Sequence, residues 1–410
     1  MTTVDEWVAV YQDLHRNPEL SFQETRTAAI AADRLAAMGY AVTTGVGGTG
    51  VVGLLANGDG PVVLLRADMD GLPVEEKTGL DYASTQRGVD DEGNDVAVMH
   101  ACGHDVHVTC LLAACETLAG DRATWSGTVM AVFQPAEEKG AGAQAMLDDG
   151  LYERFGTPSV VLGQHVAPLP AGVIGLRAGA TFAASDGVRI VLHGRGAHGS
   201  RPEASVDPVV MAAATVMRLQ TIVSREVGGS EVAVVTVGKL SAGTVINVIP
   251  DSAELLINVR TFDAGVQSRV LAAIERIARG EAIAAGAPRE PDVDHLSSFP
   301  AVVNDAEAVE RTRPALAREC LAVVDPGPVT GSEDVGLLAT AAGAPCVFWL
   351  LGGADSEQFA GLTSIEAIAE KVRAIPSNHS PLYAPVADPT LSIGAAALVS
   401  AAREWLGAAT

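Results

Sequence analysis

Basic residues are scarce in this sequence of 410 residues. Lysine and arginine together number 27 against 50 aspartates and glutamates, which gives a formal net charge of -23. A nucleic-acid-binding groove needs a basic surface to neutralise phosphates, and the sequence shows no such basic footprint. The same acidic balance disfavours anionic membrane surfaces. We therefore expect neither nucleic acid nor membrane as a partner, and a substrate carboxylate would need a local cationic clamp.

Cysteines are few, and long apolar runs are missing. Five cysteines, an odd number, provide no disulfide framework, and Cys110, Cys115, Cys320 and Cys346 lie in apolar stretches typical of a core. No segment reaches the roughly 18 continuous apolar residues that a membrane-spanning helix needs. The N-terminal residues include acids where a signal peptide has its basic region. These absences predict a soluble, cytoplasmic protein.

Hydrophobic residues, in contrast, are plentiful. They make up 48% of the sequence, and a chain of this length exceeds the usual size of a single core. From about Asp186 the pattern changes to alternating strands and long helices in a β-α-β-β-α order, and PREPDVDHL then indicates a charged exit segment. We expect an α/β domain with a mixed sheet, formed by 1–183 and 296–410 and interrupted by an inserted α+β domain at 184–295.

The stretch HACGHDVH, residues 100–107, concentrates side chains that bind metals. It holds three histidines, a cysteine and an aspartate, although the whole chain has only 9 histidines, and each of these types can bind a divalent metal. Gly103 lets Cys102 and His104 turn toward one point, because backbone without a Cβ tolerates tight turns. The alternative is a loop of scattered polar residues with a core cysteine and a helix-capping Asp105.

Charged residues follow the continuous apolar run 62–65. Such a run is typical of a strand that is buried on both faces of a parallel or mixed sheet, and here it ends in Arg66, Asp68 and Asp70. Open α/β sheets bind ligands at the carboxyl ends of their strands. The charges therefore indicate a ligand site, with solvated loop charges as the alternative.

Two further predicted strands end in the same way. The strand 128–133 precedes Glu137 and Glu138, and VVLGQHV ends in His165. Adjacent side chains on extended backbone point in opposite directions, so one glutamate would face a metal and the other the substrate. Alone, the pair would be better explained as a solvated acidic turn; beside a metal loop it indicates a ligand and a general base.

Three more residues stand out by their setting. His379 lies in IPSNHSPLYAP, a loop held between prolines, and is either a metal ligand or a surface histidine. His198 is flanked by glycines in GRGAHGSRP, so its backbone can closely approach another group. Arg260 ends a strand of the inserted domain, where a carboxylate clamp and an ordinary salt bridge are both open.

Two glycine-rich segments fit the pattern of a dinucleotide-binding loop, which would suggest a nicotinamide-dependent oxidoreductase. GVGGTG at 45–50 precedes a predicted strand, where that motif requires a helix, and GRGAHG at 194–199 lacks an acidic strand end about 20 residues later. No HExxH, P-loop or GxSxG motif is present. The oxidoreductase therefore has little support.

Nine ordered motifs carry a family resemblance. They are LHRNPELSFQE, LRADMDGLPVEE, MHACGHDVH, FQPAEE, GQHV, GRGAHGSRP, NVIPDSAEL, GSED and NHSP. With them the chain resembles, nearly end to end, the bacterial and plant amidohydrolases that include hippurate hydrolases, N-acyl-amino-acid amidohydrolases and auxin-conjugate hydrolases. The resemblance implies cleavage of the amide bond of an N-acyl amino acid and an inserted lid domain that also forms a homodimer contact. A dipeptidase or carboxypeptidase, or an inactive binding protein on the same fold, is the alternative.

The resemblance also implies site residues and cofactors. Two divalent ions, of zinc, manganese, cobalt or nickel, would be held by Cys102, His104, Glu138, His165 and His379. Glu137 would be the general acid and base. Asp68 or Asp70 would be the aspartate that orients a ligand, and the sequence leaves this choice open.

In the inserted domain, the resemblance implies that His198 reaches the active site of the partner subunit. Asn247, in NVIPDSAEL, and Arg260 are the candidate substrate-binding residues. The chain departs from the family pattern at two positions. Relatives often have histidine where this chain has Glu203, and glycine where it has Lys139. Neither residue is a presumed ligand, and both bear on substrate choice.

Overall fold

The computed structural model describes residues 2–408 and divides the chain into two compact units. The second unit consists of Ala180–Val302 together with Pro328–Glu333, and the remaining residues form the first. The sequence predicts an insertion at 184–295. The observed unit begins earlier, extends further and takes up the short segment at 328–333.

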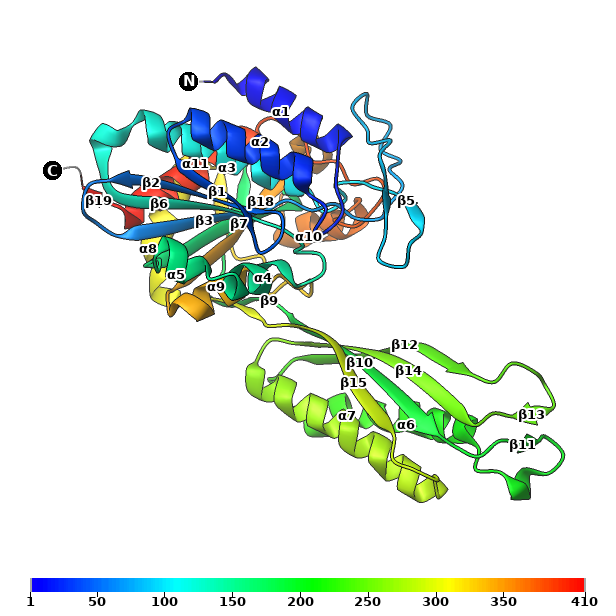
Figure 1. Ribbon diagram of the computed structural model, residues 1–410. Helices are drawn as coiled ribbons and strands as arrows, with labels where there is room; N and C mark the ends of the chain where they lie inside the picture. Colours follow the sequence, from blue (N-terminus) through cyan, green and yellow to red (C-terminus); the bar gives the residue numbers. More distant parts are fainter. Residues whose placement is uncertain (1, 409–410) are drawn as a thin grey trace. The chain divides into compact units, whose positions relative to one another are not determined.

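A nine-stranded sheet forms the centre of the first unit (Figure 1). In spatial order its strands are β1 (Ala41–Val46), β2 (Gly50–Asn57), β6 (Trp125–Gln134), β3 (Val62–Asp68), β7 (Val160–Pro170), β18 (Cys346–Ala354), β8 (Val173–Gly175) and β17 (Ala322–Val324), and β19 (Gly407–Ala408) pairs with β6. Strands β6, β3, β7 and β18 run parallel, whereas β2 is antiparallel to both of its neighbours. This mixed sheet confirms the predicted α/β fold.

Burial on both faces explains why the sequences of the central strands are continuous apolar runs. In β3 every residue after Val62 is buried, and in β18 only the final residue is partly exposed. Helices cover both faces of such a sheet, so no side chain position faces water. Because β6, β3 and β7 are parallel, their carboxyl ends lie at one edge, where Asp68 ends β3 and the paired glutamates follow β6. Strand β7 continues to Pro170, so His165 lies within this strand and not at its end as the sequence predicts.

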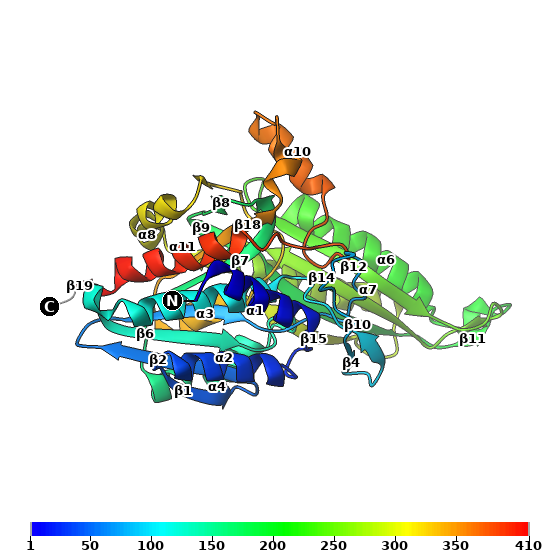
Figure 2. The same ribbon diagram turned by 90° about the horizontal axis from the view of Figure 1, so that it is seen from above.

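Helices cover the sheet on both faces. Those of the first unit are α1 (Val4–Arg16), α2 (Thr25–Ala37), α3 (His104–Gly120), α4 (Gly142–Asp148), α5 (Leu151–Phe155), α8 (Ala306–Glu319), α9 (Val335–Ala342), α10 (Ile365–Ala374) and α11 (Thr390–Trp405). Helices α1, α3 and α11 contact one another on one face (Figure 2), and α4, α5 and α9 lie on the other (Figure 1). Helix α3 is buried nearly all round, as its apolar sequence requires.

The second unit is a four-stranded antiparallel sheet with two helices on one face (Figure 1). Its strands are, in spatial order, β12 (Ala233–Ala242), β14 (Ser252–Thr261), β10 (Ala184–His193) and β15 (Asp292–Phe299). Buried residues alternate with partly exposed ones along β10 and β14, and the buried face packs against α6 (Pro208–Thr221) and α7 (Ala264–Ala285). A separate pair, β11 (Ala197–His198) and β13 (Val248–Ile249), extends beyond this sheet.

Strand β15 corrects the interpretation of PREPDVDHL as an exit segment. Residues from Asp292 pair with β10 and form an edge of the sheet. Most side chains of β15 are exposed, so its sequence lacks the apolar alternation by which a strand is recognised.

The remaining short strands are β4 (Arg87–Val89) and β5 (Asp95–Ala97), which form a hairpin, and β9 (Gly179–Phe182) and β16 (Val302–Asn304). Among residues 2–408, no helix has both the length and the apolar composition that crossing a membrane requires.

Candidate metal centre

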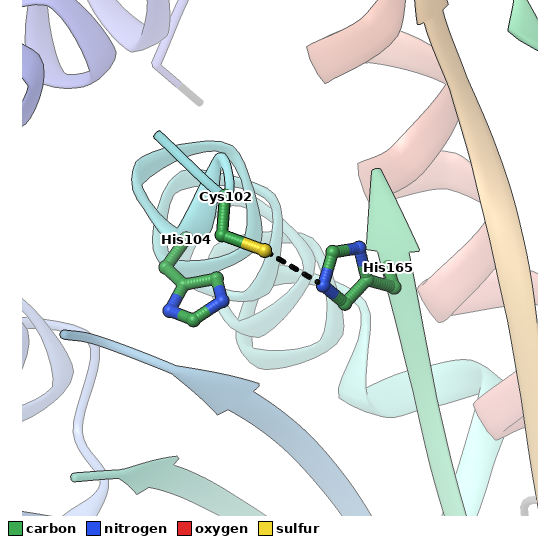
Figure 3. A group of neighbouring side chains, drawn as sticks. All are labelled: Cys102, His104 and His165. Carbon is green, nitrogen blue, oxygen red and sulfur yellow. Dashed lines mark hydrogen bonds between the residues drawn. The ribbon is translucent and has the colours of Figure 1, made fainter. Parts of the chain in front are cut away.

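Cys102, His104 and His165 come together at the carboxyl edge of the large sheet (Figure 3). Gly103, the residue before α3, has a φ of 82°, and a Cβ at this position would lie 2.4 Å from a methyl carbon of Val166. Glycine is therefore required both for the left-handed backbone and for the close approach. The tight turn directs the thiol of Cys102 toward His165, with 3.4 Å between Sγ and Nε2. All three side chains are buried.

Two further groups extend this cluster. Cys102, Glu138 and His379 form one, and His104, Glu137 and Glu138 form the other, with the possible ligand atoms of each group within 4.8 Å of one another. The structure thus brings all five predicted ligands and Glu137 together, although they come from separate segments of the chain. The donors are thiol, imidazole and carboxylate, the set that binds zinc and similar divalent ions.

Two buried donor atoms fit a cation: neither makes a hydrogen bond, although Glu138 Oε1 lies 3.3 Å from His379 Nε2. His104 Nε2 and Glu138 Oε1 are buried without a hydrogen-bond partner, and 3.8 Å separates them. Buried polar atoms in proteins normally have partners. A divalent ion between these donors would satisfy both atoms.

In His104 and His165 the Nδ1 atom has a hydrogen-bond partner, and this sets which nitrogen faces the cluster. His104 Nδ1 lies 3.2 Å from Asp70 Oδ1, and His165 Nδ1 lies 2.8 Å from the carbonyl oxygen of Val166. Both rings therefore present Nε2 to the cluster. Such contacts orient metal-binding imidazoles. Burial lowers the pKa of His165 well below its ordinary value, which favours the neutral form that binds metals.

Burial has the opposite effect on the cysteine. It raises the pKa of the Cys102 thiol well above its ordinary value, and the charges of Glu138 and Glu137 add to this shift. The thiolate is the form that binds metals. A thiolate at this buried position therefore needs a neighbouring cation.

Asp68 and Asp70 have different partners. Asp70 contacts the His104 ring and also accepts the hydroxyl hydrogen of Ser21. Asp68 contacts Arg66 Nη1 at 2.6 Å and His107 Nδ1, and its Oδ2 also lies 3.7 Å from His104 Nε2. Burial alone would raise the pKa of Asp68, but the charge of Arg66 and the neighbouring imidazoles outweigh it and hold this pKa well below its usual range.

His107 and His100 also belong to the dense motif but are not among the five predicted ligands. The possible ligand atoms of His107, His104 and Asp68 lie within 4.8 Å of one another. His107 accepts a hydrogen bond from the backbone N–H of Val166 at Nε2, and its Nδ1 contacts Asp68. Both of its nitrogens are therefore engaged. His100 is buried, its ring nitrogens have no hydrogen-bond partner, and burial lowers its pKa to about 4.

The backbone around the paired glutamates differs from the prediction. Residues 137–140 form a turn rather than extended chain, so the alternation of a strand does not apply to them. Glu137 Oε2 and Glu138 Oε1 lie 3.9 Å and 3.8 Å from the same atom, His104 Nε2. The expectation that the two side chains point in opposite directions is therefore wrong.

His379 lies at the more open side of the cluster. Its backbone N–H donates to the carbonyl oxygen of Ala101, its Nε2 is 3.3 Å from Glu138 Oε1, and 58% of its side chain is exposed. The amide of Asn378 donates to the carbonyl oxygens of Cys102 and Val166. Sequence reasoning missed Asn378, although it stands in the NHSP motif beside His379.

A buried ion network lies behind Asp68. Arg66 Nη2 is 3.1 Å from Asp334 Oδ1, and Gln134 contacts both residues. The side chains of Arg66 and Asp334 are fully buried. Asp334 ends the GSED motif, so only the family resemblance pointed to it.

The predicted residues of the second unit lie around its β11–β13 pair and on β14. His198, in β11, is exposed, and its Nδ1 is 2.7 Å from Ser200 Oγ. The exposed Asn247 accepts a backbone hydrogen bond from Gly199. Arg260, at the end of β14, contacts Asn258 and Ser332.

The two glycine-rich segments have structural roles. Residues 45–50 form the turn between β1 and β2, and residues 194–199 lead into β11 and include it. Neither opens a helix, as a dinucleotide-binding loop would.

Comparison with known proteins identifies the family. The model of peptidase family M20/M25/M40 matches residues 64–374. An N-acetyl-L-cysteine deacetylase of Bacillus subtilis (strain 168) is 37% identical over 335 residues, which cover 81% of this chain and 77% of the relative. A hippurate hydrolase of Campylobacter jejuni is 39% identical over 307 residues, which cover 74% of this chain and 76% of the relative.

A solved structure agrees with these matches. A Bacillus subtilis protein described as a dinuclear metal binding peptidase of the M20 family superposes with a TM-score of 0.78 at 30% identity, covering 98% of this chain and 99% of that chain. The matches confirm the resemblance of the nine motifs. The chain therefore belongs to peptidase family M20/M25/M40 and is a metallo-amidohydrolase that binds divalent metal ions.

Proposed function

We propose that this enzyme hydrolyses the amide bond of N-acyl amino acids and releases a carboxylic acid and an amino acid. The observation that carries the proposal is the cluster of buried donors in which His104 Nε2 and Glu138 Oε1 have no hydrogen-bond partner. The names of two relatives, a hippurate hydrolase and an N-acetyl-L-cysteine deacetylase, support acyl groups such as benzoyl and acetyl.

Two divalent ions would be held by the five donors, with zinc, manganese, cobalt and nickel as candidates. The ligands would be Cys102, His104, Glu138, His165 and His379, which form overlapping groups. Divalent ions, when bound, polarise a carbonyl oxygen and lower the pKa of water. Asp70 would orient His104, because its carboxylate contacts Nδ1 of that ring.

Glu137 would move the proton during hydrolysis. Its carboxylate lies beside His104 in the cluster, where it can take a proton from the attacking water and later deliver it to the leaving amine. Glu138, whose Oε1 lies near both His104 and His379, would serve as a ligand. His198 would stabilise the negative charge that develops on the amide oxygen.

Arg260 would bind the carboxylate of the substrate, with Asn247 beside it. The contacts of Arg260 are with neutral groups, Asn258 Oδ1 at 3.0 Å and Ser332 Oγ at 2.9 Å. Among residues 2–408 no carboxylate forms an ion pair with this guanidinium. Its charge is therefore available to an anionic group, for which arginine offers a fixed set of donors.

A homodimer would form through the second unit. Strand β12 is an edge strand with exposed Val234 and Leu240, and α6, which contacts β12, exposes Val210 and Met217. Edge strands and exposed apolar side chains of this kind favour association. Five free cysteines support a reducing, cytoplasmic location.

A hydrolysis screen with metal analysis tests the function. N-acetyl, N-benzoyl and indole-acetyl amino acids would be supplied to protein reconstituted with each metal, with dipeptides as the comparison. We expect cleavage of at least one N-acyl class, about two ions per chain by elemental analysis, and loss of activity with chelator. Activity that persists in chelator with no bound metal would refute the proposal, and faster turnover of dipeptides would assign a peptidase.

A further inference from the structure

Two buried carboxylates accept three successive backbone N–H groups at the paired glutamates. The N–H of Ala136 donates to Glu24 Oε1 at 2.8 Å. The N–H groups of Glu137 and Glu138 donate to the two oxygens of Asp70, at 3.2 Å and 3.0 Å. Glu24 and Asp70 therefore hold one stretch of backbone, and Glu24 holds its first residue.

Ala136 marks a sharp bend in this stretch. Its φ of 47° lies in the left-handed region, which residues with a Cβ adopt only when surrounding contacts impose it. The carbonyl oxygen of Ala136 accepts hydrogen bonds from the N–H groups of Ala141 and Gly142, and that of Glu137 accepts one from Gly140. The bend directs the chain from strand β6 into the turn that carries both glutamates.

Glu24 is a buried carboxylate, and both of its oxygens accept hydrogen bonds. It is fully buried, and its second oxygen accepts the hydroxyl hydrogen of Thr49. Among the described residues no cation forms an ion pair with it, although burial of an unpaired carboxylate is costly. Burial and then the charge of Asp70 raise the pKa of Glu24 to about 6. The two hydrogen bonds that Glu24 accepts offset part of the cost of burying its carboxylate.

We propose that Glu24 is a positioning residue for catalysis. Through the N–H of Ala136 it fixes the bend that places the carboxylate of Glu137 for proton transfer. The inference rests on the proposed role of Glu137 as the base, and it adds a residue from the loop before α2 that does not itself touch the substrate.

Two substitutions separate the hydrogen bonds of Glu24 from its charge. Glu24→Gln keeps an oxygen for Ala136 and offers an N–H to the Thr49 hydroxyl, which can rotate to accept it. Glu24→Ala removes both contacts and frees the bend. We expect Glu24→Ala to lower kcat about 10- to 100-fold with KM and metal content unchanged, because small displacements of a catalytic group have costs of this size. Glu24→Gln should regain most of the loss.

Glu19→Ala is the matched control. Glu19 lies in the same segment, and its carboxylate accepts the N–H groups of Arg26 and Thr27 at the start of α2. Its removal should lower the melting temperature in the same way as Glu24→Ala, without touching Ala136. We expect kcat of Glu19→Ala to stay within about threefold of wild type, because the Glu19 carboxylate holds the start of α2 and not the bend at Ala136.

Hydrogen exchange supplies a measurement that needs no activity. In metal-loaded and metal-free protein, the amides of residues 136–138 should exchange at least tenfold faster in Glu24→Ala than in wild type, Glu24→Gln or Glu19→Ala. Equal exchange and equal kcat in Glu24→Ala and Glu19→Ala would overturn the inference. A wild-type protein that cleaves no N-acyl amino acid, or a fully active Glu137→Gln, would instead overturn the proposed function, and the exchange rates would still decide whether Glu24 holds the bend.

Discussion

Two aspartates only two positions apart have different partners in this protein. Asp70 contacts the ring of His104 and the backbone of both glutamates, whereas Asp68 is held between Arg66 and His107. Their spacing could not distinguish them, because residues two apart at a strand end are directed to the same side. Apart from Arg66, these partners come from distant segments, which sequence spacing does not reveal.

We expect the two adjacent glutamates, Glu137 and Glu138, to have different roles that substitution can separate. Glu137→Gln should keep metal but lose several orders of magnitude in kcat, because one substitution removes both the base and the acid. Glu138→Ala should lose metal affinity first, since Glu138 Oε1 lies near both His104 and His379. Elemental analysis and steady-state kinetics of both variants make the comparison. Equal loss of metal in the two variants, with Glu137→Gln still active, would contradict the assigned roles.

Among the elements, the buried strands were predictable and the polar ones were not. The apolar runs of β3 and β6 lead into charged residues, and this contrast indicated both the strands and the edge at which the donors meet. Strand β7 was expected to end at His165 but continues to Pro170. Strand β15 has mostly exposed side chains, so its sequence lacks the alternation of apolar and polar residues from which a strand is predicted. The turn at 137–140 was not predicted because it depends on hydrogen bonds that backbone N–H groups donate to Glu24 and Asp70, which are remote in sequence.

One buried histidine links two helices of the first unit. His15, in the last turn of α1, contacts Asp105 in the first turn of α3 at 2.6 Å, and its other nitrogen is 3.1 Å from Glu76. Burial alone would lower the pKa of His15, but Asp105 and then Glu76 outweigh it and raise this pKa from 6.5 to about 10. The ring is therefore charged at neutral pH.

This raised pKa predicts how stability depends on pH. The stabilisation from His15 is complete below its unfolded pKa near 6.5 and is lost as pH rises toward about 10. The pKa values of Asp105 and Glu76 are lowered, so both stay ionised in this window. Chemical denaturation of metal-loaded protein from pH 6.5 to 9.5 should show a falling free energy of unfolding, by at most about 1.4 kcal/mol per pH unit from this residue.

His15→Gln should flatten that slope. His295→Gln is the control, because the side chain of His295 is exposed and its Nε2 lies 3.7 Å from Glu275. It should leave the slope as in wild type. Identical slopes in wild type and His15→Gln would show that the link between α1 and α3 carries no charge.

For the whole molecule, the open question is whether two chains share an active site. His198 and Asn247 are exposed at the β11–β13 end of the second unit, far in sequence from every proposed ligand. Their chemistry as hydrogen-bond donors suits an oxyanion or a substrate carboxylate. In the proposed homodimer, the second unit of each chain would contribute His198 and Asn247 to the metal centre of the partner subunit.

Mixing of inactive variants tests this sharing. His198→Ala should lower kcat by about 10²–10³ while metal content stays constant, as removal of one oxyanion donor does. If His198 acts across subunits, a mixed dimer of His198→Ala and Glu137→Gln has one site with both defects and one with neither. Part of the activity should therefore return after subunit exchange. A mixture that exchanges subunits without recovering activity would place His198 in its own chain's site or outside catalysis.

The place of β18 in the sheet constrains how the protein matures on the ribosome. Cys346–Ala354 forms this strand, which pairs with β7 and β8, both made much earlier in synthesis. Until those residues emerge, β7 presents an open edge to the nascent chain's surroundings, and His379 has yet to be translated. The donor set is thus completed only after the whole second unit has been made. We therefore expect the ions to be bound late, and a nascent chain arrested before β18 should expose that edge to chaperones.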